Sequence, residues 1–364
     1  MEDPLATGDK TDAAAKPPRP LRRVRKRILC VNAGSTSLKL SVVEPDGAAA
    51  PVESLEAVPD DVAAVAHRVV HGGIRFREPV VIDDAVEREL EAAVELAPLH
   101  NAPALAAISQ ARQALPELPQ VAVFDTAFHA TIPEEAATYA LPQQVREDWG
   151  VRRFGFHGLS VQWASERVCM PRLVVCHLGG GCSVTAVSDG RSVDTTMGFT
   201  PLEGVPMATR AGSVDPGALL YLLEHHLTLE SLNRMLEHES GLAGLSGLSG
   251  DVRELEASNA PEARLALAVF AYRVATAVGA MATALDGLDA IVFTAGIGEN
   301  SASVRAAVCE RLGFLGVELD TDGNASARPD ATVSTAESPV RVIVLEARED
   351  VVAARAARQL LGVS

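Results

Sequence analysis

The stretch from Leu173 to Arg210 reads LVVCHLGGGCSVTAVSDGRSVDTTMGFTPLEGVPMATR, and it indicates how the whole chain is built. An apolar run stops at three glycines, Gly179 to Gly181, and a second apolar run leads to a Ser-Asp-Gly turn. The pattern predicts a strand, a tight loop and a second strand. Three glycines leave backbone N–H groups uncovered by side chains, so a phosphate oxygen can approach them closely. Taken alone, the pattern also fits an ordinary hairpin with a loose turn.

The same arrangement occurs earlier in the chain. Residues Ile28 to Val43 read ILCVNAGSTSLKLSVV, which is an apolar strand, a small polar turn from Asn32 to Ser37 and a second strand. Two copies roughly 145 residues apart indicate a duplicated domain in which one loop faces the other. We expect the phosphates of a nucleotide to lie between the two loops.

The composition is that of a globular chain with room for two domains. Of the 364 residues, 48% are hydrophobic and 22% are charged. No apolar run in the sequence approaches the roughly 20 residues of a membrane span. The net charge of −16 argues against nucleic acid as a partner, because a negative field repels phosphate backbones.

The N-terminal sequence and the cysteines favour a cytoplasmic location. The first residues, MEDPLATGDK, lack the apolar core of a secretory signal. The cysteines are odd in number, include no CxxC pair and lie mostly in apolar runs, which favours buried thiols in a reducing compartment and argues against a zinc site. They are Cys30, Cys169, Cys176, Cys182 and Cys309.

Two features of the basic residues stand out. Residues 1–27 are predicted to be a disordered leader, and the basic run from Arg19 to Arg27 within it is either solvated or an interaction tail. Lys39 is the only lysine after this leader. Its compact ammonium suits a phosphate oxygen beside the predicted loop, although chance retention on an outward strand face is the alternative.

Further along the chain, polar residues follow predicted strands. A strand from Val121 to Phe124 carries Asp125 at its carboxyl end, where ligands bind in open α/β sheets. A strand over 290–293 is followed by a turn over 294–300 and then a helix, which is a geometry suited to a nucleotide. We also expect a helix over 85–97 ended by the prolines at 98 and 103, one helix over 217–236, a loop over 241–250 and one buried helix over 260–285.

A series of motifs, taken in order, resembles the acetate kinase family of the acetate and sugar kinase, Hsp70 and actin superfamily. The resemblance runs from about Ile28 to the C-terminus, and its motifs are NAGSTSLK, HRVVHGG, APLHN, FDTAFH, FGFHG, CHLGGG, MGFTPLEG, ATRAGSVDPG, SGLSGDVREL, FTAGIGENS and a late ED. It implies an α/β fold of two duplicated actin-like (ribonuclease H-like) domains with a nucleotide cleft between them. Residues 28–126 with the C-terminal helix 349–364 would form the first domain, and residues 127–348 the second, with the nucleotide site and the dimer surface.

The resemblance also implies a reaction and its partners. Acetate kinases transfer the γ-phosphoryl group of ATP to acetate, reversibly and with Mg²⁺ (or Mn²⁺ in its place), giving acetyl phosphate and ADP. The family implies a homodimer that is metabolically paired with a phosphotransacetylase or a phosphoketolase.

Site residues follow from the motif positions. The resemblance assigns catalysis to Arg68, Asp125, His157 and Arg210. His157 would donate a hydrogen bond to the phosphoryl group, because a carboxylate nucleophile needs no base at pH 7. Asn32 and Glu349, with Asp125, are assigned to the magnesium site. Together with Arg68, the acetate site would comprise Val70, Leu99, Phe156 and Pro201. Nucleotide contacts are expected at Lys39, His177, Leu178, Gly179, Gly180, Gly181, Asp251, Val252, Arg253, Gly296, Ile297, Gly298 and Asn300.

The chain also departs from the family pattern. Gly180 and Arg348 each stand where an asparagine is usual, Leu159 to Val161 replace Thr-Ser-His, and the first domain is shortened between Lys39 and Arg68. These departures keep open a catalytically weak relative that binds ATP. A propionate or butyrate kinase of the same family, with a different acid pocket, is a further alternative. A sugar kinase lacks support because no sugar-binding set is visible.

Overall fold

The structure is a computed structural model that describes residues 26–33, 38–92 and 98–363, without the side chains of residues 98–100. Nearly all of the expected leader, most of the turn after Asn32 and the side chain of Leu99 lie outside the described residues.

Two six-stranded sheets organise the fold. The first has the order β3-β2-β1-β4-β6-β5, and the second, read in the same sense, has the order β9-β8-β7-β10-β12-β11. In both sheets the first strand pairs antiparallel with the second and parallel with the fourth. One topology thus occurs twice, and the predicted α/β fold of two duplicated domains is confirmed.

The strands of the first sheet are β1 (Arg27–Ala33), β2 (Leu38–Val43), β3 (Ala49–Val52), β4 (Val62–Val69), β5 (Val80–Val81) and β6 (Gln120–Phe124). Those of the second are β7 (Arg172–Leu178), β8 (Cys182–Ser188), β9 (Arg191–Thr195), β10 (Ala290–Thr294), β11 (Ala331–Thr332) and β12 (Arg341–Val344). Between β2 and β4 the chain forms only β3 and the short 3-10 helix η1 (Leu55–Ala57).

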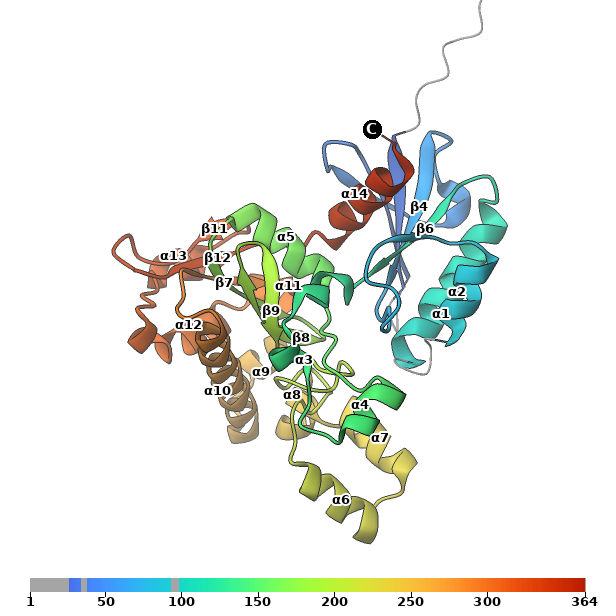
Figure 1. Cartoon of the computed structure of the whole chain (residues 1–364). Coiled ribbons are helices and arrows are strands. Elements are labelled where there is room, and N and C mark those ends of the chain that lie inside the picture. The colour runs from blue at the N-terminus through green and yellow to red at the C-terminus, as the bar shows by residue number, and fades with distance from the viewer. Residues whose placement is uncertain (1–25, 34–37, 93–97, 364) are drawn as a thin grey trace, which may run out of the picture.

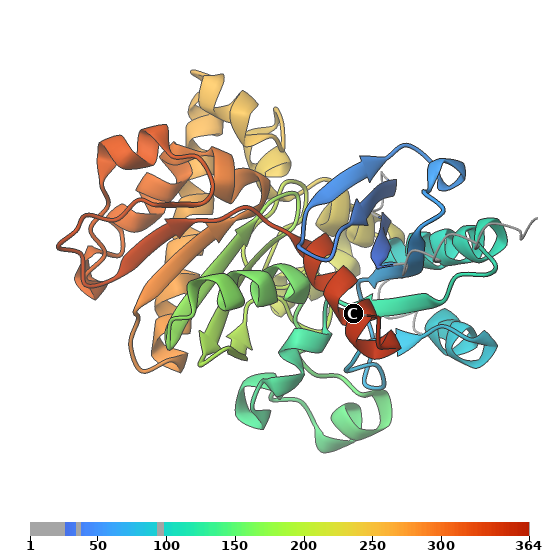
Figure 2. The same cartoon turned by 90° about the horizontal axis from the view of Figure 1, so that it is seen from above.

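Helices cover both faces of each sheet, because successive side chains of a strand point to opposite faces. In β1, Cys30 packs with the C-terminal helix α14 (Glu349–Leu361), whereas Leu29 packs with α2 (Pro98–Ala114). In β7, Cys176 packs with α10 (Pro261–Ala284) and Val175 with α5 (Gly158–Val168). Figure 1 shows α14 beside β4 and β6, and Figure 2 shows the chain crossing from the second sheet to the first just before this helix.

The other helices complete the two domains. They are α1 (Asp84–Ala92), α3 (Glu134–Ala137), α4 (Gln143–Trp149), α6 (Pro216–His225), α7 (Leu229–His238), α8 (Gly241–Ser246), α9 (Val252–Ala257), α11 (Ala295–Asn300), α12 (Ala302–Glu310) and α13 (Thr321–Ser326), with the 3-10 helices η3 (Ala127–Thr131) and η4 (Gly313–Leu315). By length and composition α10 could span a membrane, but its buried residues Phe270, Val274 and Val278 belong to the core of the second domain.

Several local predictions are wrong. The single helix expected over 217–236 is two helices, α6 and α7, because the side chain of Thr228 accepts a hydrogen bond from Ser231 N–H and starts a new helix. The loop expected over 241–250 contains α8, and the turn expected over 294–300 is the helix α11. The prolines do not interrupt helical structure where they stand, since α2 begins at Pro98 and includes Pro103. Packing of its later turns outweighs the one lost backbone hydrogen bond.

Four of the cysteines are buried, as expected, but Cys169 is exposed at the end of α5.

Candidate active site

Arg68 and Asp125 form an ion pair at the carboxyl edge of the first sheet. Arg68 lies near the end of β4, and Asp125 directly follows the parallel strand β6. Arg68 donates from Nε to Asp125 Oδ1 at 2.9 Å and from Nη2 to Oδ2 at 2.5 Å, and the Asp125 side chain is fully buried. Such a bidentate contact holds the guanidinium in one orientation.

Asn32 and Glu349 extend this cluster from two other elements. Asn32, in β1, accepts a hydrogen bond from Arg68 Nη1 at 3.1 Å. Glu349 begins α14, and its Oε2 lies 3.5 Å from Arg68 Nε and 3.4 Å from Asn32 Nδ2. The structure therefore brings together the residues expected around the metal, although residue 32 and residue 349 lie at opposite ends of the sequence.

The electrostatics of the cluster follow from burial. Burial works to lower the pKa of Arg68, but the carboxylates of Asp125 and Glu349 outweigh it and the pKa is raised, so the guanidinium stays charged. Burial raises the pKa of Asp125, against the opposing effect of Arg68. One cation faces two carboxylates, which leaves an excess of negative charge.

The donor atoms suit Mg²⁺, which prefers oxygen ligands and is usually held by one or two carboxylates with phosphate oxygens and water. Asp125 and Glu349 supply the carboxylates and Asn32 an amide oxygen. Within the described part of the chain, no group of three or more histidine, cysteine, aspartate or glutamate side chains could hold a metal by itself. The residues present fit a magnesium ion that takes its remaining ligands from a bound nucleotide and water.

His157 lies at the start of α5 in a left-handed conformation, with φ of 59°. Such a conformation is uncommon for residues other than glycine and clusters at functional sites. The next residue, Gly158, passes so close to the first sheet that a Cβ there would lie 2.1 Å from Asp125 O. Only glycine therefore allows His157 to approach the Asp125 end of β6.

The His157 ring has a defined environment. Its Nδ1 lies 3.0 Å from Ser183 Oγ, and the ring stacks on His177 with 4.1 Å between centroids. Burial lowers the pKa of His157 well below its usual value, and the positive charges of Arg68 and Arg210 and repulsion from His177 lower it further. The imidazole is consequently neutral at pH 7.

Arg210 approaches from the second domain. It donates from Nε to Glu237 Oε2 in α7 at 3.0 Å. A Cβ placed on Gly181 would lie 3.0 Å from His157 Nε2 and 3.7 Å from Arg210 Nη1, so both side chains border the glycine loop at this point. The structure thus brings Arg68, His157 and Arg210 to the facing edges of the two domains.

The glycine loop over 179–181 and the segment over 294–300 are neighbours because β7 and β10, which precede them, are adjacent parallel strands. A Cβ on Gly179 would lie 3.5 Å from Ala295 Cβ and 3.9 Å from Gly296 N. Asn300 at the end of α11 donates from Nδ2 to Gly296 O at 2.9 Å, and Gly298 is buried. His177 is held by Ser160, with Nδ1 2.8 Å from the hydroxyl, and burial lowers its pKa to about 4.

A cavity of about 970 Å³ lies between the first sheet, the start of α14 and α11. Lys39, Asn32 and Arg68 line it from the first sheet, Glu349 from α14, and Gly296 from α11. The size is in the range of small-molecule sites. Among the described residues, those lining the cavity do not include Asp251, Val252 or Arg253, which start α9, where Arg253 donates to the Asp251 carboxylate. Leu178, in β7, is fully buried and does not line it either. Apart from Lys39 and Gly296, the other expected nucleotide residues, all of them described, do not line the cavity, namely His177, Gly179, Gly180, Gly181, Ile297, Gly298 and Asn300.

Two of the expected acetate-pocket residues, Val70 and Phe156, are 7% and 1% exposed and belong to the same hydrophobic core cluster. Pro201 is buried on a loop that follows β9. Several residues that hold the site were not predicted, namely Ser160, Ser183 and Glu237. Two small polar residues and a helical glutamate have no sequence pattern that distinguishes them from the other serines and glutamates of the chain.

Transfer of a phosphoryl group requires positive charge and hydrogen-bond donors around its oxygens, and facing domains can supply these from two sides. The duplicated fold and its charged interdomain edge define an actin-like, two-domain phosphotransferase. The chain belongs to the acetokinase family, whose model matches residues 49–355.

The relatives are consistent with this assignment. The chain is 50% identical to an acetate kinase of Synechococcus sp. (strain JA-2-3B'a(2-13)) over 312 residues, which cover 83% of this chain and 77% of the relative. It is 43% identical to an acetate kinase of Methanosarcina acetivorans over 313 residues, with the same two coverages. Family membership makes the chain a phosphotransferase with a carboxyl group as acceptor.

Solved structures agree in fold. Porphyromonas gingivalis acetate kinase superposes with a TM-score of 0.83 at 33% identity, covering 92% of this chain and 100% of that one. A propionate kinase from Francisella tularensis subsp. tularensis SCHU S4 superposes with a TM-score of 0.84 at 33% identity, covering 91% of this chain and 98% of that one.

Proposed function

We propose that this protein is an acetate kinase, which transfers the γ-phosphoryl group of ATP reversibly to acetate and gives acetyl phosphate and ADP. The observation that carries the proposal is the convergence of Arg68 from the first domain with His157 and Arg210 from the second. We infer that residues 28–126 with the C-terminal helix 349–364 form the first domain and residues 127–348 the second.

The acetate carboxylate is ionised at pH 7, so it can attack the γ-phosphorus without a base. A bond forms between a carboxylate oxygen and phosphorus while the bond to the β,γ-bridging oxygen breaks, and ADP leaves. Arg68 and Arg210 present planar guanidinium groups, one to the carboxylate and the other to the transferring phosphoryl group. Their orientation is maintained by Asp125 and Glu237.

His157 acts as a neutral hydrogen-bond donor in this mechanism. When the Ser183 hydroxyl donates to Nδ1, the ring proton resides on Nε2, which faces the glycine loop. From there Nε2–H can donate to an oxygen of the phosphoryl group. A neutral ring also avoids adding a third positive charge beside two arginines.

Asp125, Glu349 and Asn32 would hold Mg²⁺, directly or through water, and Mn²⁺ can replace it. When bound, the ion neutralises charge on the nucleotide phosphates. Lys39 lines the same cavity and supplies a point charge for a phosphate oxygen.

Propionate is a second candidate substrate. One methylene in an apolar pocket changes binding by only about 1 to 3 kcal/mol, and the walls predicted from Val70, Leu99, Phe156 and Pro201 are apolar. The similar Francisella tularensis structure is of a propionate kinase.

We further expect a cytoplasmic homodimer. Helix α6 contains no buried residue, although it carries large apolar side chains: Leu220 is 60% exposed and Tyr221 is 56% exposed. In Figure 1, α6 projects away from the first domain. An apolar surface of this kind is typical of an interface. A phosphotransacetylase or phosphoketolase would be the metabolic partner.

The test is formation of acyl hydroxamate from acetate, propionate and butyrate with ATP and Mg²⁺. We expect turnover on acetate and a loss of roughly 10²- to 10³-fold in kcat for Arg210→Ala, since a donor to the phosphoryl group is removed. Arg234→Ala is the matched control, because Arg234 lies in α7, the helix that Arg210 contacts through Glu237, but its side chain is 61% exposed. If ATP binds and none of the three acids reacts, the protein is instead a catalytically weak ATP-binding relative.

A further inference from the structure

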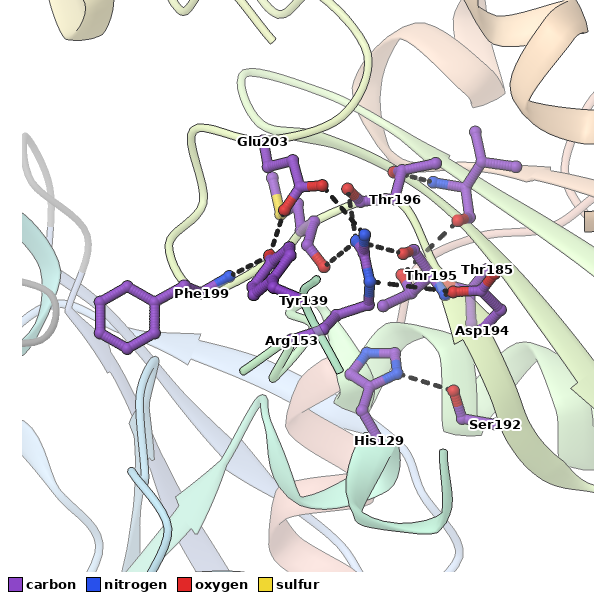
Figure 3. A network of polar contacts seen from close by, with 12 residues as sticks. His129, Tyr139, Arg153, Thr185, Ser192, Asp194, Thr195, Thr196, Phe199 and Glu203 are labelled. Carbon is purple, nitrogen blue, oxygen red and sulfur yellow. Dashed lines mark hydrogen bonds and ion pairs between the residues drawn. The ribbon is translucent and has the colours of Figure 1, made fainter. Parts of the chain in front are cut away.

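The guanidinium of Arg153 binds both ends of the loop that runs from Thr195, the last residue of β9, to Gly204. Arg153 donates from Nη1 to three successive carbonyl oxygens, those of Thr195 at 2.8 Å, Thr196 at 3.1 Å and Met197 at 3.1 Å. Figure 3 shows these bonds converging on Arg153 at the end of β9. Three carbonyls that turn toward one cation define the path of the backbone here.

The same guanidinium reaches the far end of the loop. Its Nη2 donates to Glu203 Oε1 at 2.9 Å, and Glu203 Oε2 accepts from the hydroxyl of Tyr139. The Tyr139 hydroxyl in turn accepts from Phe199 N–H at 3.0 Å, and Figure 3 shows it between Phe199 and Glu203. A Cβ on Gly198 would lie 1.7 Å from Glu203 Oε2 and 2.0 Å from Tyr139 Oη, so this pair packs directly on the loop backbone.

The next two carbonyl oxygens of the loop, those of Gly198 and Phe199, also accept hydrogen bonds. Gly198 O accepts from Phe154 N–H at 3.0 Å, and Phe199 O lies 3.3 Å from His71 Nε2. Since His71 Nδ1 accepts from Gly73 N–H, its Nε2 carries the proton and donates to Phe199 O. Every carbonyl from residue 195 to residue 199 therefore has a donor, and residues 200–202 are held at both ends.

This arrangement adjoins the predicted acetate pocket. His71 follows Val70 in sequence, and its ring lies edge-on to Phe156 with 5.3 Å between centroids and to Phe154 with 4.6 Å. Phe154 in turn lies 5.9 Å from Phe199. The segment that carries Pro201 is thus tied to the walls that Val70 and Phe156 would form.

We propose that Arg153, Glu203 and Tyr139 are positioning residues that hold Pro201 against the acyl chain and so set the chain length that the site accepts. The inference rests on the proposed function, because it requires a carboxylic acid substrate. Burial, followed by the hydrogen bond and charge of Glu203, raises the pKa of Tyr139, so its hydroxyl keeps the proton that it donates.

The test compares kcat and KM of Tyr139→Phe and wild type for acetate, propionate, butyrate and ATP. Loss of the hydroxyl frees Phe199 N–H and loosens the loop. We expect the KM for acetate to rise about 3- to 10-fold, and the propionate-to-acetate ratio of kcat/KM to rise by a similar factor. The KM for ATP should stay within about twofold, since none of the three residues lines the 970 Å³ cavity between the first sheet, α14 and α11. A merely structural role would lower the melting temperature without changing the acid preference.

Two further variants complete the design. Arg153→Lys, which keeps the charge but loses the planar fork, should shift the acid preference further in the same direction. Tyr272→Phe, on α10 where the ring is 53% exposed, is the matched control and should match wild type. An active Tyr139→Phe enzyme with wild-type KM for acetate and wild-type acid preference overturns this inference alone. A wild-type enzyme inactive on every acid overturns the proposed function, and this inference with it.

Discussion

Gly180 in the glycine loop has room for a side chain, in contrast to Gly181. A Cβ placed there would meet no atom within 4 Å, whereas one on Gly181 would press on His157 Nε2. The residue is exposed and, unlike several glycines of this chain, does not have a positive φ. Nothing in the backbone therefore requires glycine at this position.

The prediction at this scale concerns Gly180→Asn, which restores the residue usual in the family. An added amide donor beside the nucleotide phosphates should lower the KM for ATP about 2- to 10-fold, as one hydrogen bond contributes about 0.5 to 1.5 kcal/mol. Steady-state kinetics with varied ATP measure the change. Gly180→Ala, which adds only the Cβ, should leave the KM as it is, and an Asn variant no better than the Ala variant would contradict the prediction.

At the scale of elements, the buried side chain of Arg305 joins three helices. From α12 it donates to Gly298 O at 2.9 Å and Glu299 O at 3.0 Å in α11, and to Oδ1 and O of Asn324 in α13 at 2.7 and 2.9 Å. It is 1% exposed, and burial lowers its pKa. The carbonyls at the end of α11 need such a donor, since they have no partner within that helix.

Replacing Arg305 by methionine should leave these buried acceptors unpaired. We expect Arg305→Met to lower the free energy of unfolding by about 3 kcal/mol, and to raise the KM for ATP because α11 carries Gly296 and Asn300. Urea titration followed by tryptophan fluorescence measures the stability. The control is Arg311→Met, which replaces an exposed arginine just beyond α12 whose guanidinium donates to Ala307 O. Equal losses in the two variants would refute the assignment.

At the scale of the whole molecule, histidines buried along both domains make folding sensitive to acid. Burial lowers the pKa of His67, His71, His129 and His177 to about 4, from a usual value near 6.5. Between these two pH values the unfolded chain binds protons that the native protein does not bind. The free energy of unfolding must therefore fall as the pH falls from about 6.5 to about 4, and these groups have little effect above pH 7.

Urea unfolding at pH 7.5 and pH 5.5 tests this expectation. Each of these histidines should lower the free energy of unfolding by roughly 1 kcal/mol over that interval. His67→Gln should reduce the pH dependence, whereas Gln113→Ala, which removes an exposed side chain of α2 that does not titrate, should leave it unchanged. A free energy of unfolding that is the same at both pH values would show that the buried rings are not kept neutral.

Prediction from sequence succeeded where a feature repeats or ends a strand. The apolar strands 28–43 and 173–188 with their loops predicted the duplication, and Asp125 was placed correctly at the carboxyl end of its strand. It failed where a local contact decides, as at Thr228, whose cap splits one apolar helical stretch into two helices. The roles of Arg68, His157 and Arg210 stay predictions until the variants are measured.

By itself the sequence determined the two strand–loop–strand repeats, the small residues of their loops and the family of the chain, because these depend on the order and spacing of neighbouring residues. Only the tertiary structure decided which distant groups meet. Ser183 holds His157, Glu237 holds Arg210, and Glu349 from the last helix returns to Arg68. Such pairings depend on how helices pack across two sheets, so they cannot be predicted from the sequence spacing of the partners.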